Sequence, residues 1–144
     1  EENMILYVYH EYYKNKMTDD KTAKEIAYMK DELITADSED PKAIMYYNLQ
    51  GFRMRGCKKW AGSRLSNTRK VKRFKQIVIS TACPNCWNEL KDLTYKKNPK
   101  TDELIYDEFN IDPHTFSAIW YALDLYDMAD LKSRQRSSQK GAIA

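Results

Sequence analysis

The sequence predicts an α/β domain in which short buried strands lead into helices. Two apolar runs, at residues 33–36 and 77–79, carry no charge and are rich in β-branched residues, which is typical of strands covered on both faces of a sheet. A proline opens a helical pattern after each run, Pro41 after the first and Pro84 after the second. With 144 residues and 42% hydrophobic composition, the chain has the size of one domain, and we expect a central sheet flanked by helices.

The elements before Asp37 are expected to place it at the end of a strand. Residues 4–13 are rich in aromatic and β-branched side chains and predict a first strand. A helix should start at Thr18, with Asp19 and Asp20 in its first turn, and bury one face made of Ala23, Ile26 and Ala27. The strand 33–36 then ends at Asp37, where open α/β sheets form ligand-binding crevices. An isolated Asp at this place also commonly does no more than begin a turn.

Residues 40–75 should form a helix, a strand and a second helix. Asp40 can cap a helix that starts at Pro41, carries Ile44, Met45 and Leu49, and ends near Gly51. Residues 52–56 alternate like a half-exposed strand, and residues 57–65 have the composition of a loop. Ser66 is the expected cap of a basic helix that turns Val71 and Phe74 inward.

The last third should form a helix, a hairpin and a final helix. The helix from Pro84 is expected to carry an apolar stripe of Trp87, Leu90 and Leu93. Residues 93–96 and 104–108 predict a hairpin with its turn at 98–102. Asp112 should cap a helix that starts at Pro113, exposes His114 and Ser117 on one face and buries Phe116, Ile119, Trp120 and Leu123. We place the domain at residues 1–131 and a basic flexible tail at 132–144.

Positive charge is concentrated in one third of the chain. The span 41–88 contains no Asp or Glu but holds 11 of the 24 Lys and Arg residues, whereas the rest of the chain has 13 against 21 acidic residues. Such clustering favours a protein that binds phosphate backbones, although a plain solvated basic face would show the same pattern. The residues expected to contact DNA are Lys58, Lys59, Arg64, Arg69, Lys72 and Arg73.

Several other classes of protein are less consistent with the sequence. No apolar run reaches the length of a membrane span and no signal-peptide pattern is found, so we expect a cytosolic protein without a membrane partner. Three cysteines, an odd number, do not make a disulfide framework, and Cys83 with Cys86 supplies only half of a structural zinc site. A cysteine nucleophile lacks a local signature, and the absence of a glycine-rich phosphate loop argues against ATP binding.

Three blocks of sequence resemble the nuclease domain of tailed-bacteriophage large terminase subunits. They are the Ala-Asp-Ser-x-x-Pro-Lys block around Asp37, the Lys58-Lys59 pair, and the helix that runs from His114 to Leu123; the resemblance covers residues 4–128. It implies an RNase H-like fold and metal-dependent endonucleolytic cutting of concatemeric viral double-stranded DNA during genome packaging in the host cytoplasm. It also implies two Mn²⁺ or Mg²⁺ ions, a small terminase subunit and a portal protein as partners, and an ATPase motor ahead of this domain.

The resemblance assigns two catalytic metal ligands, Asp37 and His114. Asp37 matches the family's second-strand aspartate. The first-strand aspartate has no counterpart here, and we expect it about ten residues before Met4. The acidic ligand of the last helix falls on Ser117, so the histidine of that motif, His114, becomes the third ligand, and its imidazole favours Mn²⁺ more than a carboxylate would. Converging ligands of this kind suit two-metal phosphodiester hydrolysis.

Two alternatives remain open from the sequence. In a noncatalytic nucleic-acid-binding module, the basic span would bind the backbone while Asp37 and His114 were structural. In another RNase H-like nuclease, such as a junction resolvase or a transposase, the site would be similar but branched DNA would be preferred.

Overall fold

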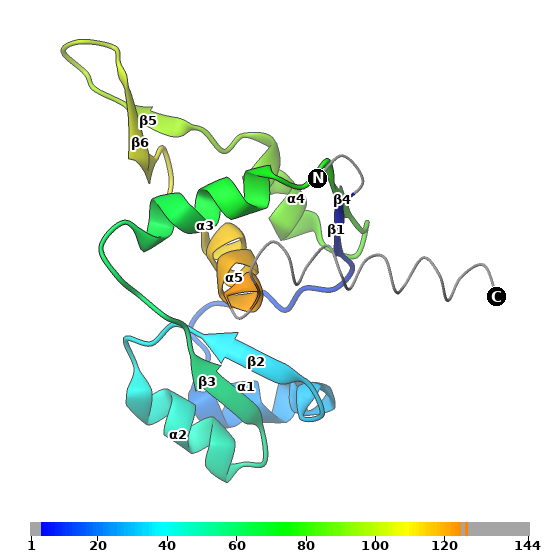
Figure 1. Ribbon diagram of the computed structural model, residues 1–144. Coiled ribbons are helices and arrows are strands. Elements are labelled where there is room, and N and C mark those ends of the chain that lie inside the picture. The colour runs from blue at the N-terminus through cyan, green and yellow to red at the C-terminus, as the bar shows by residue number, and fades with distance from the viewer. Residues whose placement is uncertain (1–3, 125, 127–144) are drawn as a thin grey trace. The chain divides into compact units, whose positions relative to one another are not determined.

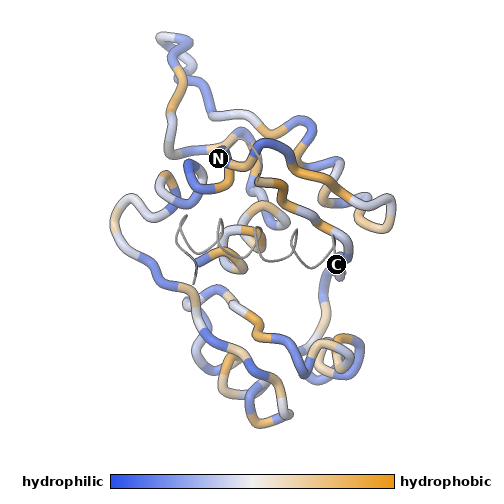
Figure 2. Tube along the Cα trace, turned by 45° about the vertical axis from the view of Figure 1, so that its right-hand side comes forward, coloured by the Kyte–Doolittle hydropathy of each residue, from blue (hydrophilic) through white to orange (hydrophobic). Residues whose placement is uncertain are grey.

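The computed structural model describes residues 4–124 and residue 126, and within them the chain forms two compact units (Figure 1). The second unit is Tyr12–Trp60, and the first unit comprises the segments on either side of it, up to Glu11 and from Ala61 onward. Apolar stretches are short along the trace and alternate with hydrophilic ones (Figure 2), as expected for small elements with one buried face.

The second unit is a pair of parallel strands with helices packed against it. It contains α1 (Asp19–Glu25), a 3₁₀ turn η1 (Ala27–Met29), β2 (Leu33–Ala36), α2 (Pro41–Leu49) and β3 (Arg53–Gly56). Strand β2 pairs with β3 from Leu33 opposite Arg53 to Ala36 opposite Gly56. The core joins Ala23 of α1, Tyr47 of α2 and Phe52, with Ile34 and Met54 of the strands packed against them. The helices thereby hold the ends of β2 and β3 in place.

The sequence places the elements of this unit well. Strand β2 has the expected bounds, and the Asp40 side chain caps α2 by accepting the N–H of Ala43 at 3.0 Å. Of the apolar residues expected on this helix, Met45 and Leu49 are 64% and 78% exposed, whereas Tyr47 is buried. The Tyr47 ring packs edge-on against Phe52, and this contact selects the buried face of the helix.

The first unit contains a second parallel pair, a hairpin and further helices. Its elements are β1 (Ile5–Val8), α3 (Ser63–Lys72), β4 (Gln76–Ile79), α4 (Pro84–Lys91), β5 (Tyr95–Lys97), β6 (Leu104–Phe109) and α5 (His114–Leu123). Strand β1 runs parallel to β4, and β5 pairs antiparallel with β6. The core cluster is Val71, Phe116, Trp120 and Leu123. The cluster packs α3 against α5, and its members Phe116, Trp120 and Leu123 belong to the apolar stripe expected for the last helix.

Three expected helix details in this unit are wrong. Helix α3 starts at Ser63 rather than after Ser66, because Gly62 adopts the left-handed conformation (φ 83°) and turns the chain one helical turn earlier. Asp112 does not cap α5, whose flanking residue is Pro113 and shows no side-chain cap. Trp87 is 56% exposed, because the buried face of α4 is the one that carries Cys86.

The first expected strand is also longer than the observed one. Strand β1 spans Ile5–Val8, whereas the sequence pattern extends to residue 13, because the ladder with β4 ends at Ile79. The hairpin agrees with the expectation, with Asp102 at φ 57° in its turn. The expected tail 132–144 and the end of the expected domain at 131 lie outside the described residues. In the described part of the chain no helix is long and apolar enough to cross a membrane.

Candidate metal site at the end of strand β2

Asp37 lies directly after β2, as expected, and its carboxylate is held from two directions. Oδ1 accepts the backbone N–H of Glu39 at 3.0 Å, which closes a tight turn, and lies 2.6 Å from the ammonium of Lys59. The Asp37 side chain is 44% exposed. The carboxylate is thus fixed by the backbone and still open to solvent, as a ligand for an incoming cation must be.

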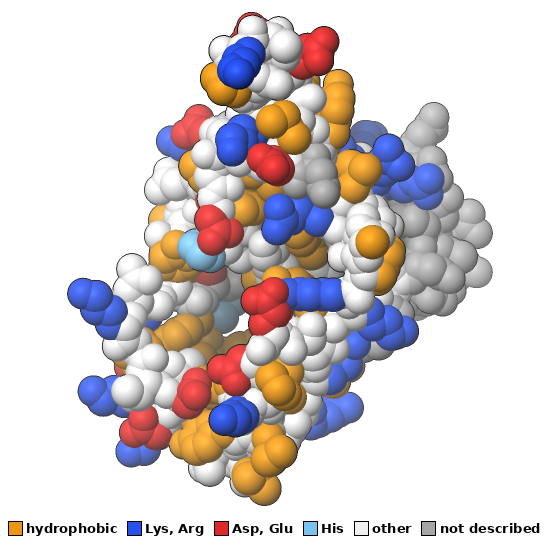
Figure 3. Space-filling view, turned by 90° about the vertical axis from the view of Figure 1, so that its left-hand side faces the viewer, with side chains coloured by type: hydrophobic (Ala, Val, Ile, Leu, Met, Phe, Trp, Pro, Cys, Tyr) orange, Lys and Arg blue, Asp and Glu red, His pale blue; other side chains and the backbone are white. Residues whose placement is uncertain are grey.

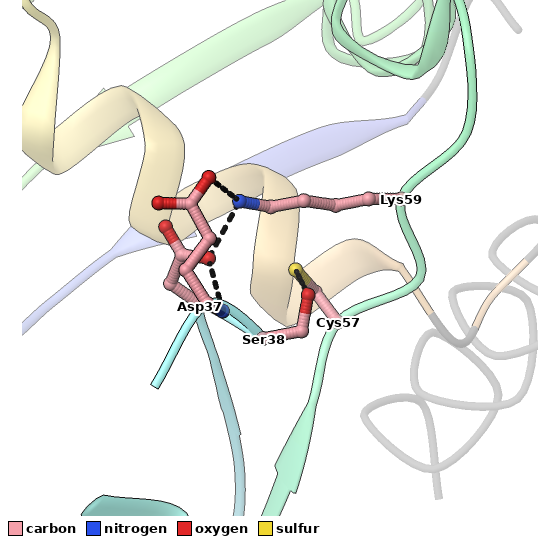
Figure 4. A network of polar contacts seen from close by, with 5 residues as sticks. Asp37, Ser38, Cys57 and Lys59 are labelled. Atoms are coloured by element: carbon pink, nitrogen blue, oxygen red, sulfur yellow. Dashed lines mark hydrogen bonds and ion pairs between the residues drawn. The ribbon is translucent and has the colours of Figure 1, made fainter. Parts of the chain in front are cut away.

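The close approach of β3 brings Lys59 to this carboxylate. The Cys57 N–H donates to the carbonyl of Ala36 at 2.8 Å, which continues the ladder one residue beyond the strands. A Cβ on Gly56 would lie 3.1 Å from the Cβ of Ser38, so the absence of a side chain at Gly56 permits the segments that follow β2 and end β3 to lie this close. Figure 4 shows the result, with Lys59 reaching back to Asp37 while Cys57 lies next to Ser38.

A second carboxylate, which the sequence reasoning missed, faces the same cation. The Lys59 ammonium lies 3.0 Å from Oε1 of Glu39, so this one ammonium is paired with the carboxylates of both Asp37 and Glu39. Its signal in the sequence is the spacing of two residues after Asp37, since an Asp turn folds the following backbone back onto the side chain. Carboxylate oxygens are hard donors of the kind that Mg²⁺ and Mn²⁺ prefer as ligands, so Asp37 and Glu39 fit a divalent metal.

His114 is the first residue of α5, and its side chain is 65% exposed. Its Nε2 lies 3.8 Å from Oδ2 of Asp112, and the helix behind it is anchored by the buried rings of Phe116 and Trp120. The helix start is capped from outside, because Glu89 of α4 accepts the N–H of Phe116 at 2.9 Å. His114 is therefore accessible on a fixed helix end, as a metal ligand there requires.

Asp37 belongs to the second unit and His114 to the first. Beside His114, the first unit has an open cavity of about 570 Å³. Its lining includes Asp112, Pro113 and Ser117 from the start of α5, together with charged side chains of α3 and the hairpin. Ser117 therefore faces a space large enough for a ligand.

The expected DNA contacts are all exposed and divide between the two units. Lys58 and Lys59 follow β3 in the second unit, whereas the first unit carries Arg64, Arg69 and Lys72 on α3 and Arg73 directly after it. Some of these cations already have partners, since the Lys72 ammonium lies 2.9 Å from the Tyr95 hydroxyl and Lys59 is held by carboxylates. Basic and acidic side chains are interspersed on the face shown in Figure 3.

The cysteines give no support to zinc or to a thiol nucleophile. Cys83 and Cys86 are fully buried, and burial raises the pKa of both thiols, which disfavours the thiolate that either role needs. Among the described residues, no group of three or more His, Cys, Asp and Glu side chains is placed to hold a metal ion. Cys57, Cys83 and Cys86 are free thiols in this structure.

Comparison with known proteins gives three concordant findings. The family model described as "Terminase RNAseH like domain" matches residues 1–125. The PBSX phage terminase large subunit of Bacillus subtilis (strain 168) is 58% identical over 133 residues, which are 91% of this chain and 30% of that protein. The crystal structure of the g2p (large terminase) nuclease domain of bacteriophage SPP1 with bound Mn matches with a TM-score of 0.73 and 26% identity, over 83% of this chain and 70% of that one. The chain thus spans less than a third of the length of its curated relative.

Proposed function

The chain belongs to the terminase RNase H-like domain family, and from this premise we propose that it is a metal-dependent endonuclease that cuts concatemeric viral double-stranded DNA during packaging. Its fold is that of the terminase nuclease domains, as the sequence predicted. The proposal rests on the carboxylate of Asp37, which is fixed at the end of β2, open to solvent and paired with the ammonium of Lys59.

Asp37 of the second unit and His114 of the first are the proposed metal ligands, and the Glu39 carboxylate lies beside Asp37 at the shared Lys59 ammonium. The crystal structure of the SPP1 nuclease domain contains bound Mn, which supports a divalent ion in this chain as well. When bound, the ion supplies Lewis-acid stabilisation of the scissile phosphate and a water of lowered pKa. We keep two ions as part of the proposal, with the first-strand aspartate expected upstream as a further ligand.

The protein groups have separate roles in this proposal. The backbone N–H of Glu39 holds the Asp37 carboxylate in one orientation before the cation arrives. The cap from Glu89 fixes the start of α5, which carries His114. The exposed basic residues of the loop after β3 and of α3 bind the DNA backbone without reading its sequence.

The proposed partners follow from membership of the terminase family. We propose that this chain acts within a longer large terminase subunit that carries an ATPase motor and works with a small subunit and a portal protein. The curated relative is more than three times as long as the matched region, which leaves room for such a motor in that protein. The proposed setting is the cytoplasm of the infected host.

Plasmid cleavage separates this proposal from its alternatives. The protein should be tested together with any natural sequence that precedes Glu1, because a further ligand is expected there. We expect supercoiled plasmid to be nicked and linearised with Mn²⁺ and left intact with EDTA. Binding of DNA without any cutting would favour the noncatalytic module, and a strong preference for four-way junctions over linear duplex would favour a junction resolvase.

A further inference from the structure

The ammonium of Lys59 lies against the Asp37 carboxylate and the neighbouring Glu39 carboxylate. It lies 2.6 Å from Oδ1 of Asp37 and 3.0 Å from Oε1 of Glu39. Oδ1 also accepts the Glu39 N–H at 3.0 Å, so its two lone pairs each have a donor. A divalent ion binds carboxylate oxygen at about 2.0–2.1 Å in the case of Mg²⁺. An ion that binds Oδ1 therefore has to displace one of these two donors, and the Lys59 ammonium is the one that is not part of the backbone turn.

Lys59 has two conceivable roles beside this carboxylate. It could orient Asp37 for the metal, or it could compete with the metal for the same oxygen. The backbone already performs the first task, because the Glu39 N–H fixes the Asp37 side chain in its turn independently of Lys59. A lysine side chain is also long and flexible, and the side chain of Lys59 is 37% exposed, so its hold on Asp37 can be broken at small cost.

We propose that Lys59 is a resident counterion that competes with the divalent metal at Asp37, with Glu39 keeping the displaced ammonium at the site. This inference rests on the proposed function, since it assumes that Asp37 is a metal ligand. When the metal arrives, Lys59 leaves Oδ1 but stays within reach of Glu39, whose side chain is 80% exposed. From there the ammonium is available to a DNA phosphate while the metal occupies the Asp37 carboxylate.

Binding of Mn²⁺, followed by the electron paramagnetic resonance signal of the free ion, tests the competition without any cleavage. The protein again includes any natural sequence that precedes Glu1. We expect Lys59→Met to bind Mn²⁺ about two- to five-fold more tightly than the wild type, which is the size of one exposed ion pair. Lys58→Met is the matched control, because it removes the same charge from the next residue of the same loop, and it should have a smaller effect. Lys59→Gln should repeat the result.

The outcomes separate the inference from the function on which it rests. If Asp37→Asn loses Mn²⁺ binding while Lys59→Met binds no more tightly than Lys58→Met, the competition is wrong and the metal site stands. Weaker binding in Lys59→Met would show that Lys59 orients the carboxylate instead. If Asp37→Asn keeps full affinity, the metal site and the competition are both overturned.

The role of Glu39 is tested by combining two variants. If Glu39 acts by holding the displaced Lys59, Glu39→Gln should weaken Mn²⁺ binding in the wild type by more than in the Lys59→Met background. An equal or larger loss in the Lys59→Met background would show that Glu39 is itself a ligand, and would contradict its role as a holder of Lys59.

Discussion

The Glu89 carboxylate of α4 accepts the backbone N–H of Phe116 in α5 at 2.9 Å. The same oxygen accepts the Thr115 hydroxyl at 2.7 Å. An N–H in the first turn of a helix has no partner within the helix, so this carboxylate acts as a cap supplied by another element. The contact ties the start of α5, and with it His114, to α4.

Removal of this cap should destabilise the protein and loosen the start of α5. We expect Glu89→Ala to lower the free energy of unfolding by about 1 kcal/mol, the usual cost of a lost cap, and Glu89→Gln to lose less because its amide oxygen still accepts. Urea denaturation measures both. Glu103→Ala on the exposed hairpin turn is a suitable control, and equal stability of the Glu89→Ala and Glu103→Ala variants would mean that the cap is unimportant.

The cap also shows where sequence reasoning stops. Asp112 followed by Pro113 has the pattern of a helix start, and the helix does begin there, but the capping carboxylate comes from a residue 27 positions away from Phe116. Local patterns cannot reveal a partner that only tertiary packing supplies. The same limit explains why Tyr47, and not Met45 or Leu49, is buried in α2.

His114 should matter for cleavage through its ring nitrogen. We expect His114→Ala to lose nearly all Mn²⁺-dependent cutting, whereas His114→Asp should keep measurable activity with Mg²⁺ because it restores an oxygen ligand. Plasmid cleavage in each metal gives the comparison. Full activity of His114→Ala would show that the histidine is only a helix-start residue, and Asp112 would become the next candidate for the third ligand.

DNA binding should depend on the loop after β3. Each true phosphate contact that is removed should reduce the slope of log K against log salt by roughly 0.9 on duplex DNA. Neutralising Lys58 and Lys59 together should therefore reduce the slope by up to twice that amount. The same double change at Lys21 and Lys24, which are exposed on α1, is the control. An unchanged slope in the loop variant would mean that both lysines face away from the DNA.

Glu11 should make the first unit sensitive to acid. Burial raises the pKa of Glu11, but hydrogen bonds from the backbone N–H groups of Asn85 and Cys86 and from the Asn85 side chain outweigh it, so the pKa lies below its ordinary value of 4.5. A lowered pKa stabilises the folded state above the unfolded pKa, and this stability is lost as the pH falls through the folded pKa.

We therefore expect the wild type to be more stable than Glu11→Gln at pH 7, by about 1 kcal/mol for a hydrogen-bonded charge. The difference should shrink as the pH falls below about 4.5, as thermal unfolding at several pH values can measure. A difference that stays constant from pH 7 to pH 3 would show that the charge of Glu11 contributes nothing.

Much of the candidate site could be predicted from the sequence because its parts are local. Strand β2, the cap of α2 and the position of Asp37 all follow from adjacent residues. The ion pair of Lys59 with Asp37 spans 22 positions and depends on how closely β3 approaches β2, which Gly56 permits. Nothing in the linear order of residues marks Lys59 as a partner of Asp37 rather than of DNA.

The central claim is that Asp37 holds the metal with which this protein cuts DNA, and cleavage by Asp37→Asn tests it most directly. The variant should fold with unchanged stability to within about 0.5 kcal/mol, since the side chain is half exposed and contributes little packing. We expect plasmid cleavage with Mn²⁺ to fall by more than about 100-fold, beyond the 10–100-fold typical of residues that only support a metal ligand. Retention of Mn²⁺-dependent cutting near the wild-type rate would contradict the assignment.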